Sequence, residues 1–487
     1  MNILLTRRTV IAGGAAAFAV PPFPACAATV ATVLSPDAMR ADIALLRRAY
    51  EMLHPGLLRY NTPAQSAARF ATLANSCARP MTLPAFYLRL SRFLATVQCG
   101  HSYANFYNQS RTVQAALFDA PDRLPLSFLW LGPRMIVTAD PFATGIVPGS
   151  EVLAIDGRPA GEVLAALMTM ARADGGNDGK RRRLMSVQGE DGYESFDIFF
   201  SLLFGGRTRY RLLVADPAGR RRTAVLEAVS LAQRRAHRPR DVDTSGDRPV
   251  WTIERHGSAA LLTMPTWAFY NTHWDWAGWL NEEIDRLCAD RVPRLIVDLR
   301  GNEGGNDCGN VLAARLLDHP TTLDTAHRLV RYRRIPPDLR PALDTWDRRF
   351  DDWGDAAQPF DSRYLELTGA RERWETLAPR GPRYTGAVTV LTDAQNSSAT
   401  FAFAQLARRE RLATLVGEPT GGNRRGINGG GFYFLRLPAT GLEVDLPLIG
   451  TFPRASEPNA GIVPDRRIAP TIADITTARD PVIAALL

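Results

Sequence analysis

The spacing of hydrophobic residues changes along the chain and predicts three kinds of structure. Apolar residues recur at helical spacing from Met39 to Leu53 and from Leu83 to Val97, so the N-terminal part is predicted to be helical. Between about 120 and 230, short apolar runs bounded by glycine and proline favour strands instead. From residue 250 onward, strand-like and helix-like runs alternate, which is typical of an α/β layer with buried strands.

The run G-I-V-P-G-S-E-V-L-A-I-D-G at 145–157 predicts a turn, a short strand at Val152–Ile155 and a tight turn. It indicates a compact β-rich module. Residues 319–385 are rich in Arg, Asp, Pro and Trp, and we interpret them as an insertion or lid. The predicted organisation is therefore an N-terminal helical region at 28–119, a β module at 120–230, a polar linker at 231–249 and a core at 250–487.

The first 27 residues are predicted to be an export signal. Arg7 and Arg8 precede an apolar run that ends near Phe23, and Ala25 and Ala27 are small residues suited to cleavage. The arginine pair fits the twin-arginine route, and an ordinary secretory signal is the alternative. No later segment has about twenty uncharged apolar residues. We therefore expect a periplasmic or secreted protein without stable membrane insertion.

Composition narrows the function classes. The chain has 487 residues, 46% hydrophobic and 22% charged, which suits a globular protein of two to four domains. Its net charge of +8 comes from scattered arginines with few interleaved aromatics, so no nucleic-acid partner is expected. Lys180 is the only lysine.

Four cysteines remain after the predicted signal. Cys77 with Cys99, and Cys288 with Cys308, are the local disulfide pairings that an oxidising compartment would permit. Free buried thiols are the alternative.

The segment D-A-Q-N-S-S-A-T at 393–400 lies between an apolar strand and an amphipathic helix, with Ser397 and Ser398 at the helix start. Backbone N–H groups there are unpaired and the helix dipole is positive, which suits an oxyanion beside a nucleophile. Plain helix capping by Asn396 or Ser397 is the alternative.

A second glycine-rich segment, L-I-V-D-L-R-G-N-E-G-G-N at 295–306, predicts a strand that runs into a loop with exposed backbone amides. Such a loop suits a second oxyanion donor, or serves only as a turn. Its spacing is that of neither a Walker loop nor a dinucleotide fingerprint.

Two further segments accompany the serine segment and the glycine-rich segment. Gly417-Glu418-Pro419-Thr420 follows Ser398 by one helix and one strand, and G-I-V-P-D lies at 461–465. Together the four segments resemble those of the C-terminal processing (tail-specific) serine peptidases. The resemblance implies an α/β fold: a crotonase-like peptidase core, a PDZ-like module at 120–230 and an N-terminal helical region. It also implies an exported serine endopeptidase with a polypeptide substrate, in which the module recognises substrate C-termini.

Many members of this family use a Ser–Lys dyad, with the lysine shortly after Gly-Glu-x-Thr. Here Arg424 and Arg425 occupy that stretch, and arginine cannot lose its proton at ordinary pH. Lys180 is far along the chain, so we expect no dyad. The chain is more similar to the tricorn-like branch, which uses Ser, His and Glu.

In that branch the histidine follows the N-terminal helices, which points to His101 in Q-C-G-H-S. The resemblance implies Ser398 as nucleophile, His101 as base and Glu457 as the third member, with Glu418 as its competitor. The amides of Ala399 and of Gly304 or Gly305 would hold the oxyanion. No cofactor or metal is implied, because no clustered ligand set appears.

Two other functions remain open from the sequence. One is a catalytically inactive protein that binds a ligand or peptide on the same fold. The other is a hydrolase that acts on esters. The oligomeric state does not follow from the sequence.

Overall fold

The computed structural model describes residues 33–189, 192–238, 244–323, 325–368 and 376–487. The predicted export signal at 1–27 lies outside these residues. None of the described helices is both long enough and apolar enough to cross a membrane.

Helices dominate the N-terminal region: α1 (Pro36–Leu53), α2 (Pro63–Ser76), α3 (Leu83–Val97) and α4 (Arg111–Phe118), with β1 (Val33–Leu34) paired to β2 (Met81–Thr82). Each helix begins after a Ser or Thr whose hydroxyl accepts a backbone N–H of the first turn, which satisfies an otherwise unpaired donor. Helix α3 ends at Gln98, which has a left-handed backbone with φ of 58°. The loop that follows carries His101.

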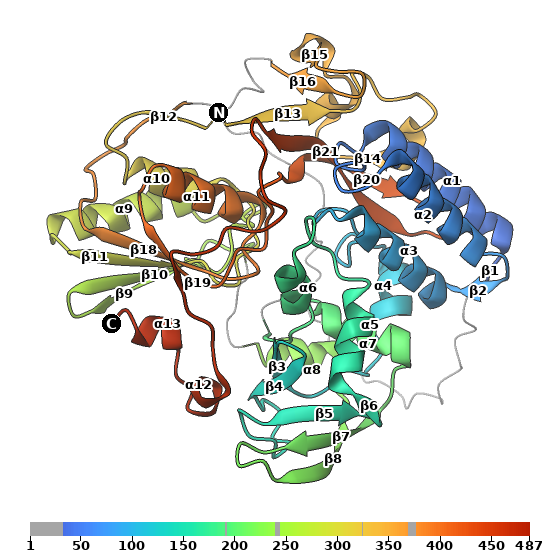
Figure 1. The fold of residues 1–487 in the computed structure, drawn as a ribbon, viewed down its shortest axis with the longest axis horizontal. Coiled ribbons are helices and arrows are strands. Elements are labelled where there is room, and N and C mark those ends of the chain that lie inside the picture. Colours follow the sequence, from blue (N-terminus) through green and yellow to red (C-terminus); the bar gives the residue numbers. More distant parts are fainter. Residues whose placement is uncertain (1–32, 190–191, 239–243, 324, 369–375) are drawn as a thin grey trace, which may run out of the picture.

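The next region is an antiparallel sheet in the order β3-β4-β5-β7-β8, with β6 paired to β5 (Figure 1). Its strands are β3 (Ser127–Leu131), β4 (Arg134–Ala139), β5 (Glu151–Ile155), β6 (Arg158–Pro159), β7 (Arg209–Ala215) and β8 (Arg221–Glu227). Helices α5 (Ala160–Met168), α6 (Asp178–Leu184) and α7 (Ser195–Phe204) lie between β6 and β7.

The stretch expected as a linker at 231–249 begins with a short helix, α8 (Leu231–Ala236). Its Arg234 is buried and pairs with Asp197 of α7, with 3.0 Å between Nε and Oδ2. The first part of this stretch therefore packs onto the sheet region.

A six-stranded sheet in the order β22-β19-β18-β11-β10-β9 forms the α/β layer. β10 (Ala259–Thr263), β11 (Arg294–Asp298), β18 (Ala387–Thr392), β19 (Thr414–Gly417) and β22 (Arg466–Arg467) run parallel, and β9 (Thr252–His256) is antiparallel to β10. Figure 1 shows α9 (Trp276–Ala289), α10 (Cys308–Ala314) and α11 (Ser398–Arg409) on one face, with α12 (Ile472–Thr476) and α13 (Pro481–Ala484) toward the other. Because helices cover both faces, the inner strands β11 and β18 are largely apolar.

The insertion at 319–385 builds a second sheet with the long hairpin of the core. Its order is β14-β20-β21-β13-β16-β15. The strands are β13 (Ala326–Val330), β14 (Leu343–Asp344), β15 (Ala357–Pro359), β16 (Leu365–Leu367), β20 (Asn428–Arg436) and β21 (Glu443–Pro453). Its described residues include short 3₁₀ helices at Arg340–Ala342, Arg348–Asp351 and Gly354–Ala356. At its ends, β12 (Thr321–Thr322) pairs with β17 (Thr376–Leu377).

Apolar residues form two large cores. One joins the N-terminal helices, the antiparallel module and the second sheet, as with Phe86, Phe128 and Leu446. The other lies between the parallel sheet and α9 to α11, as with Leu312 and Phe403.

The four cysteines in the described residues are all free thiols, so neither local disulfide pairing forms. Cys99 Sγ instead accepts a hydrogen bond from Asn428 Nδ2 at 3.3 Å. Burial raises the pKa of the Cys99 thiol to about 11, which keeps it protonated and unreactive.

Candidate active site

Ser398 occupies a sharp turn between β18 and α11. Its φ is 52°, in the left-handed region that L side chains rarely adopt and that costs about 1–3 kcal/mol. Ser397, the preceding residue, is extended with φ of −138°. A strained serine at a strand-to-helix turn is the arrangement that exposes a nucleophilic hydroxyl at the edge of an α/β sheet.

The two neighbouring serines also differ in their contacts. Ser397 is 7% exposed, and its hydroxyl donates to the carbonyl of Glu303 at 3.2 Å. Ser398 is more exposed, and within the described part of the chain its hydroxyl makes no hydrogen bond. The structure therefore favours Ser398 over Ser397 as the reactive hydroxyl.

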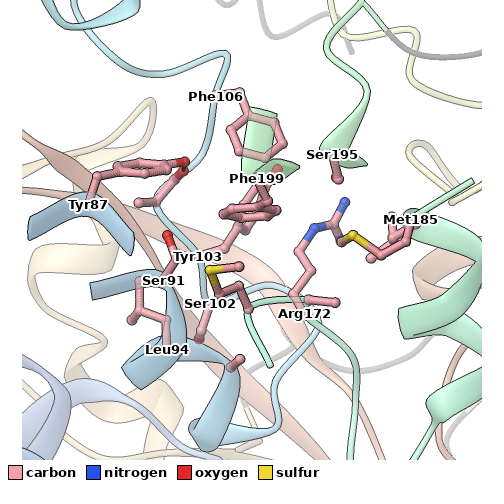
Figure 2. A pocket seen from close by; sticks show the side chains of 15 residues that line it. Tyr87, Ser91, Leu94, Ser102, Tyr103, Phe106, Arg172, Met185, Ser195 and Phe199 are labelled. Carbon is pink, nitrogen blue, oxygen red and sulfur yellow. Dashed lines mark hydrogen bonds between the residues drawn. The ribbon is translucent and has the colours of Figure 1, made fainter. Parts of the chain in front are cut away.

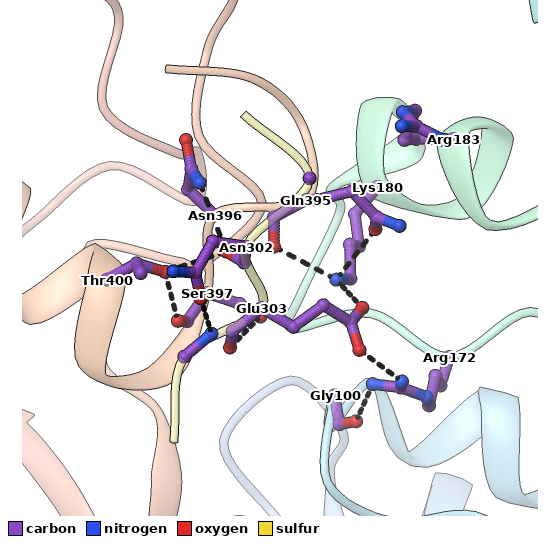
Figure 3. A network of polar contacts seen from close by, with 12 residues as sticks. Gly100, Arg172, Lys180, Arg183, Asn302, Glu303, Gln395, Asn396, Ser397 and Thr400 are labelled. Carbon is purple, nitrogen blue, oxygen red and sulfur yellow. Dashed lines mark hydrogen bonds and ion pairs between the residues drawn. The ribbon is translucent and has the colours of Figure 1, made fainter. Parts of the chain in front are cut away.

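Asn396 holds the turn in place from several sides (Figure 3). Its Nδ2 donates to the carbonyl oxygens of Leu299 and Asn302, the latter at 3.1 Å. Its backbone oxygen accepts from the amides of Gly421 and Gly422 at 2.7 and 3.0 Å. These bonds tie the serine turn to the loop after β11 and to the segment after Thr420, so its strained backbone is well supported.

The loop after β11 packs directly against the serine. A Cβ atom on Gly304 would lie 2.8 Å from Ala399 N and 2.9 Å from Ser398 Cβ, so only glycine fits there. The N–H of Gly304 already donates to Asn302 Oδ1 at 2.9 Å. By contrast, the hydrogen bonds of the described residues include none from Gly305 N or Ala399 N. Of the two glycines expected to serve the oxyanion, Gly305 has the available donor.

His101 lies in the loop after α3, and residues of the antiparallel module hold this loop. Gly100 N donates to Asp174 Oδ1 at 2.9 Å, and Arg172 Nη1 donates to Gly100 O at 2.9 Å. On the other side, Ser102 Oγ contacts His54 Nε2 at 2.8 Å. Gly56 N donates to His54 Nδ1, so His54 carries its proton on Nε2 and donates to Ser102.

The His101 ring is packed but not fully satisfied. It contacts the ring of Phe432, with 5.7 Å between centroids, and its buried Nδ1 has no hydrogen-bond partner. Burial lowers the pKa of His101 from its ordinary 6.5, and the charge of Asp174 opposes that change. The imidazole is therefore neutral at pH 7, the form that accepts a proton.

The predicted residues are only partly brought together. Ser398, Ala399 and the Gly304–Gly305 pair are adjacent, but no hydrogen bond among the described residues joins His101 to Ser398. The carboxylate of Glu457 pairs with Arg424, with 2.6 Å between Oε2 and Nη2, and makes no hydrogen bond to His101.

Glu418, the competing acid, lies elsewhere at the edge of the parallel sheet. Its amide donates to the carbonyl of Thr392 at 2.9 Å. Burial raises the pKa of Glu418, and the neighbouring charge of Asp393 raises it further. The largest charge effects on His101 come from Asp174, Arg172, Glu303 and Lys180.

Lys180 is far from the serine along the chain, but it lies close to the serine turn in space. Lys180 belongs to α6, and its Nζ donates to Gln395 O and Gln395 Oε1, each at 3.1 Å. Gln395 is three residues before Ser398. The ammonium also pairs with Glu303, so it is occupied by acceptors and does not contact the serine hydroxyl.

Sequence reasoning missed the charged group formed by Arg172, Lys180 and Glu303. Glu303 is the variable position of the G-N-E-G-G loop, and Lys180 is the single lysine of a chain rich in arginine. These two features were the available sequence signals for Glu303 and Lys180, but no local sequence pattern links the two residues.

A small cavity of about 20 Å³ lies behind the His101 loop (Figure 2). It is lined by Ser102, Tyr103 and Arg172 together with apolar residues of α3, α6 and α7, and Ser398 is not among its lining residues. It has room for about one water molecule, so it does not hold a substrate. In the described ranges of the chain, no group of three His, Cys, Asp or Glu side chains could bind a metal ion.

Comparison with known proteins agrees with this geometry. The profile of Peptidase family S41 matches residues 258–429, which include the glycine loop and the serine turn but neither His101 nor Glu457. No curated protein sequence matches the chain significantly.

Solved structures extend the likeness to nearly the whole chain. Mature CPAF complexed with lactacystin has a TM-score of 0.61 at 16% identity, over 91% of this chain and 95% of that one. Another structure of mature CPAF gives 0.58 at 16% identity, over 91% and 94%. The photosystem II D1 C-terminal processing protease gives 0.42 at 14% identity, over 88% and 92%.

The two CPAF structures establish a shared fold, since their identity to this chain is low. The family match covers strands β10, β11, β18 and β19 of the parallel sheet, the Gly304–Gly305 loop and Ser398. Residues 258–429 thus match Peptidase family S41, and this match identifies the chain as a serine peptidase.

Proposed function

We propose that the protein is an exported serine endopeptidase in which Ser398 is the nucleophile and His101 the base. The observation that carries the proposal is the strained Ser398 beside the unbonded amides of Ala399 and Gly305. A hydroxyl next to two available N–H donors is what acyl transfer requires.

In the proposed reaction, His101 accepts the hydroxyl proton while Ser398 Oγ bonds to the substrate carbonyl carbon. The amides of Ala399 and Gly305 donate to the resulting oxyanion. The protonated His101 then gives its proton to the leaving amine as the C–N bond breaks. Water attacks the acyl-enzyme, His101 takes a proton from that water, and the proton returns to Ser398 as the ester bond breaks.

The third position of the triad is assigned to Glu457. His101 Nδ1 is buried and lacks a partner, so an acceptor is missing at that atom. Glu457 Oε2 also makes no hydrogen bond, because its contact with Arg424 is an ion pair without hydrogen-bond alignment. The assigned role requires that ion pair to open.

The module at 120–230 is assigned the role of a PDZ-like domain that recruits substrate C-termini. Its antiparallel sheet, with the turn–strand–turn segment at 145–157, supports this assignment, since such domains add a peptide as an extra strand. The substrate class is a polypeptide, as for the family.

A fluorophosphonate probe tests the mechanism directly, because only an activated serine reacts with it. We expect the wild-type chain to be labelled at Ser398 and the Ser398→Ala variant to stay unlabelled. An unlabelled wild-type chain that still binds peptide would support the alternative, a binding protein on the same fold. Comparing turnover of matched ester and amide substrates separates a peptidase from an esterase.

A further inference from the structure

Glu303, whose side chain is 33% exposed, lies at the centre of a partly buried ion cluster beside the serine turn (Figure 3). One carboxylate oxygen, Oε1, pairs with Lys180 Nζ, and the other, Oε2, accepts from Arg172 Nη2 at 2.8 Å. The Lys180 side chain is only 2% exposed. We call Arg172, Lys180 and Glu303 the Glu303 cluster.

The Glu303 cluster contacts the loops of both proposed catalytic residues. On one side, Arg172 Nη1 donates to the carbonyl of Gly100, the residue before His101, at 2.9 Å. On the other side, Lys180 Nζ donates twice to Gln395, in the turn that ends at Ser398.

Glu303 itself belongs to the loop that carries the proposed oxyanion donor. Its carbonyl accepts from Ser397 Oγ at 3.2 Å, and the next residue, Gly304, packs on Ser398. The three side chains therefore connect the base loop, the oxyanion loop and the nucleophile turn.

The charges in the cluster keep it assembled. Burial opposes ionisation of Glu303, but Arg172 and Lys180 lower the pKa of its carboxyl well below the ordinary range. Lys180 has one acceptor for each of its three N–H donors: Glu303 Oε1, Gln395 O and Gln395 Oε1. An ammonium saturated in this way serves as a structural cation and not as a base.

Since no hydrogen bond joins His101 to Ser398, their separation must be determined by the segments that carry them. We infer that the Glu303 cluster is the positioning device for this pair, with the module contributing Arg172 and Lys180 to the active-site geometry. The inference rests on the proposed roles of Ser398 and His101. These three residues act through their neighbours and do not touch the reacting atoms.

The test compares rates in folded variants of the full chain. Glu303→Gln removes the central charge but keeps the side-chain shape, and Lys180→Met removes one cation. Because a displacement of about 1 Å can reduce a rate about a hundredfold, we expect each variant to lower kcat and the fluorophosphonate labelling rate roughly 10- to 100-fold. We expect KM to change less than about twofold. The double variant should lose little more than either single variant, since the groups act as one unit.

The matched control is Asp197→Asn. Asp197 forms a more deeply buried ion pair with Arg234, inside the module and away from the serine turn. This variant should lower the thermal midpoint while leaving the labelling rate of folded protein unchanged. If Glu303→Gln does not fold, Arg172→Gln and Arg172→Lys replace it. Because Arg172→Lys keeps a cation for Glu303, it should be labelled faster than Arg172→Gln.

The possible outcomes distinguish a failure of the positioning role from a failure of the proposed mechanism. Equal labelling rates in wild type and folded cluster variants would overturn the positioning role and leave the proposed mechanism intact. An unlabelled wild type would overturn the proposed mechanism, and the positioning role with it. Slow labelling in the cluster variants but not in Asp197→Asn supports the inference.

Discussion

The carboxylate of Asp174 accepts the backbone N–H of Gly100 at 2.9 Å, so a buried acid of the module holds the residue that precedes His101. Asp174 also exerts the largest charge effect on His101, and it raises the pKa of the imidazole against the lowering effect of burial. The position and the protonation of the proposed base thus depend on the same side chain.

The first prediction concerns pH. His101 must be neutral to accept the serine proton, so activity falls when pH drops below its pKa. Because burial lowers that pKa from 6.5, we expect the acid limb of the kcat/KM profile to lie below pH 6.5. Asp174→Asn removes a charge that raises the pKa, so the limb should move to still lower pH. The exposed Asp178→Asn is the control and should leave the profile in place. A limb that moves upward in Asp174→Asn would contradict the assignment.

The second prediction separates the two serines. Ser398→Ala should reduce hydrolysis about 10⁴-fold or more and abolish probe labelling, because a triad nucleophile acts as part of a unit. Ser397→Ala should retain most activity, since its hydroxyl only donates to Glu303 O. Peptide turnover, probe labelling and far-UV circular dichroism measure the effects and confirm folding. Swapped results would assign the nucleophile to Ser397.

The third prediction concerns the glycine loop. Gly304→Ala would place a methyl group 2.8 Å from Ala399 N, at a residue with φ of 104°. We expect loss of the oxyanion geometry and roughly a hundredfold lower kcat/KM, the usual cost of removing one donor. Gly132→Ala is the matched control, because that glycine also has positive φ but open space around its Cβ. Equal activity in the two variants would show that contact with the serine turn is unimportant.

The fourth prediction tests the third member of the triad. Glu457→Gln should lower kcat roughly a hundredfold or more, because glutamine accepts a hydrogen bond but does not stabilise the imidazolium. Glu418→Gln should have a smaller effect. Arg424→Gln, which frees the Glu457 carboxylate from its ion pair, should raise kcat severalfold. A larger loss in Glu418→Gln would transfer the role to Glu418.

The fifth prediction concerns substrate recruitment by the module at 120–230. If the module binds a terminal carboxylate on backbone amides, peptides with a free apolar C-terminus should be cleaved faster than the same peptides amidated. Steady-state kcat/KM for each matched pair gives the ratio. Identical rates would remove the recruiting role without affecting the chemistry at Ser398.

The sequence by itself determined the local elements. Helix α3 spans Leu83–Val97 as expected, and α11 begins at Ser398, where the two serines were expected to open a helix. Periodicity, capping residues and glycine turns act over a few residues, so they can be recognised without the fold. The serine turn and the glycine loop are of this local kind.

Only the tertiary structure decided which distant residues meet. Lys180 and Glu303 are 123 positions apart, and their contact depends on how α6 packs against the loop after β11. The same holds for Asp174 and Gly100, for the second sheet formed by β13 to β16 with β20 and β21, and for the four free cysteines. Charged residues and cysteines follow no periodic pattern in the sequence, because their partners depend on how elements far apart in the sequence pack together. The arrangement of the base, the nucleophile and the Glu303 cluster is therefore a property of the fold.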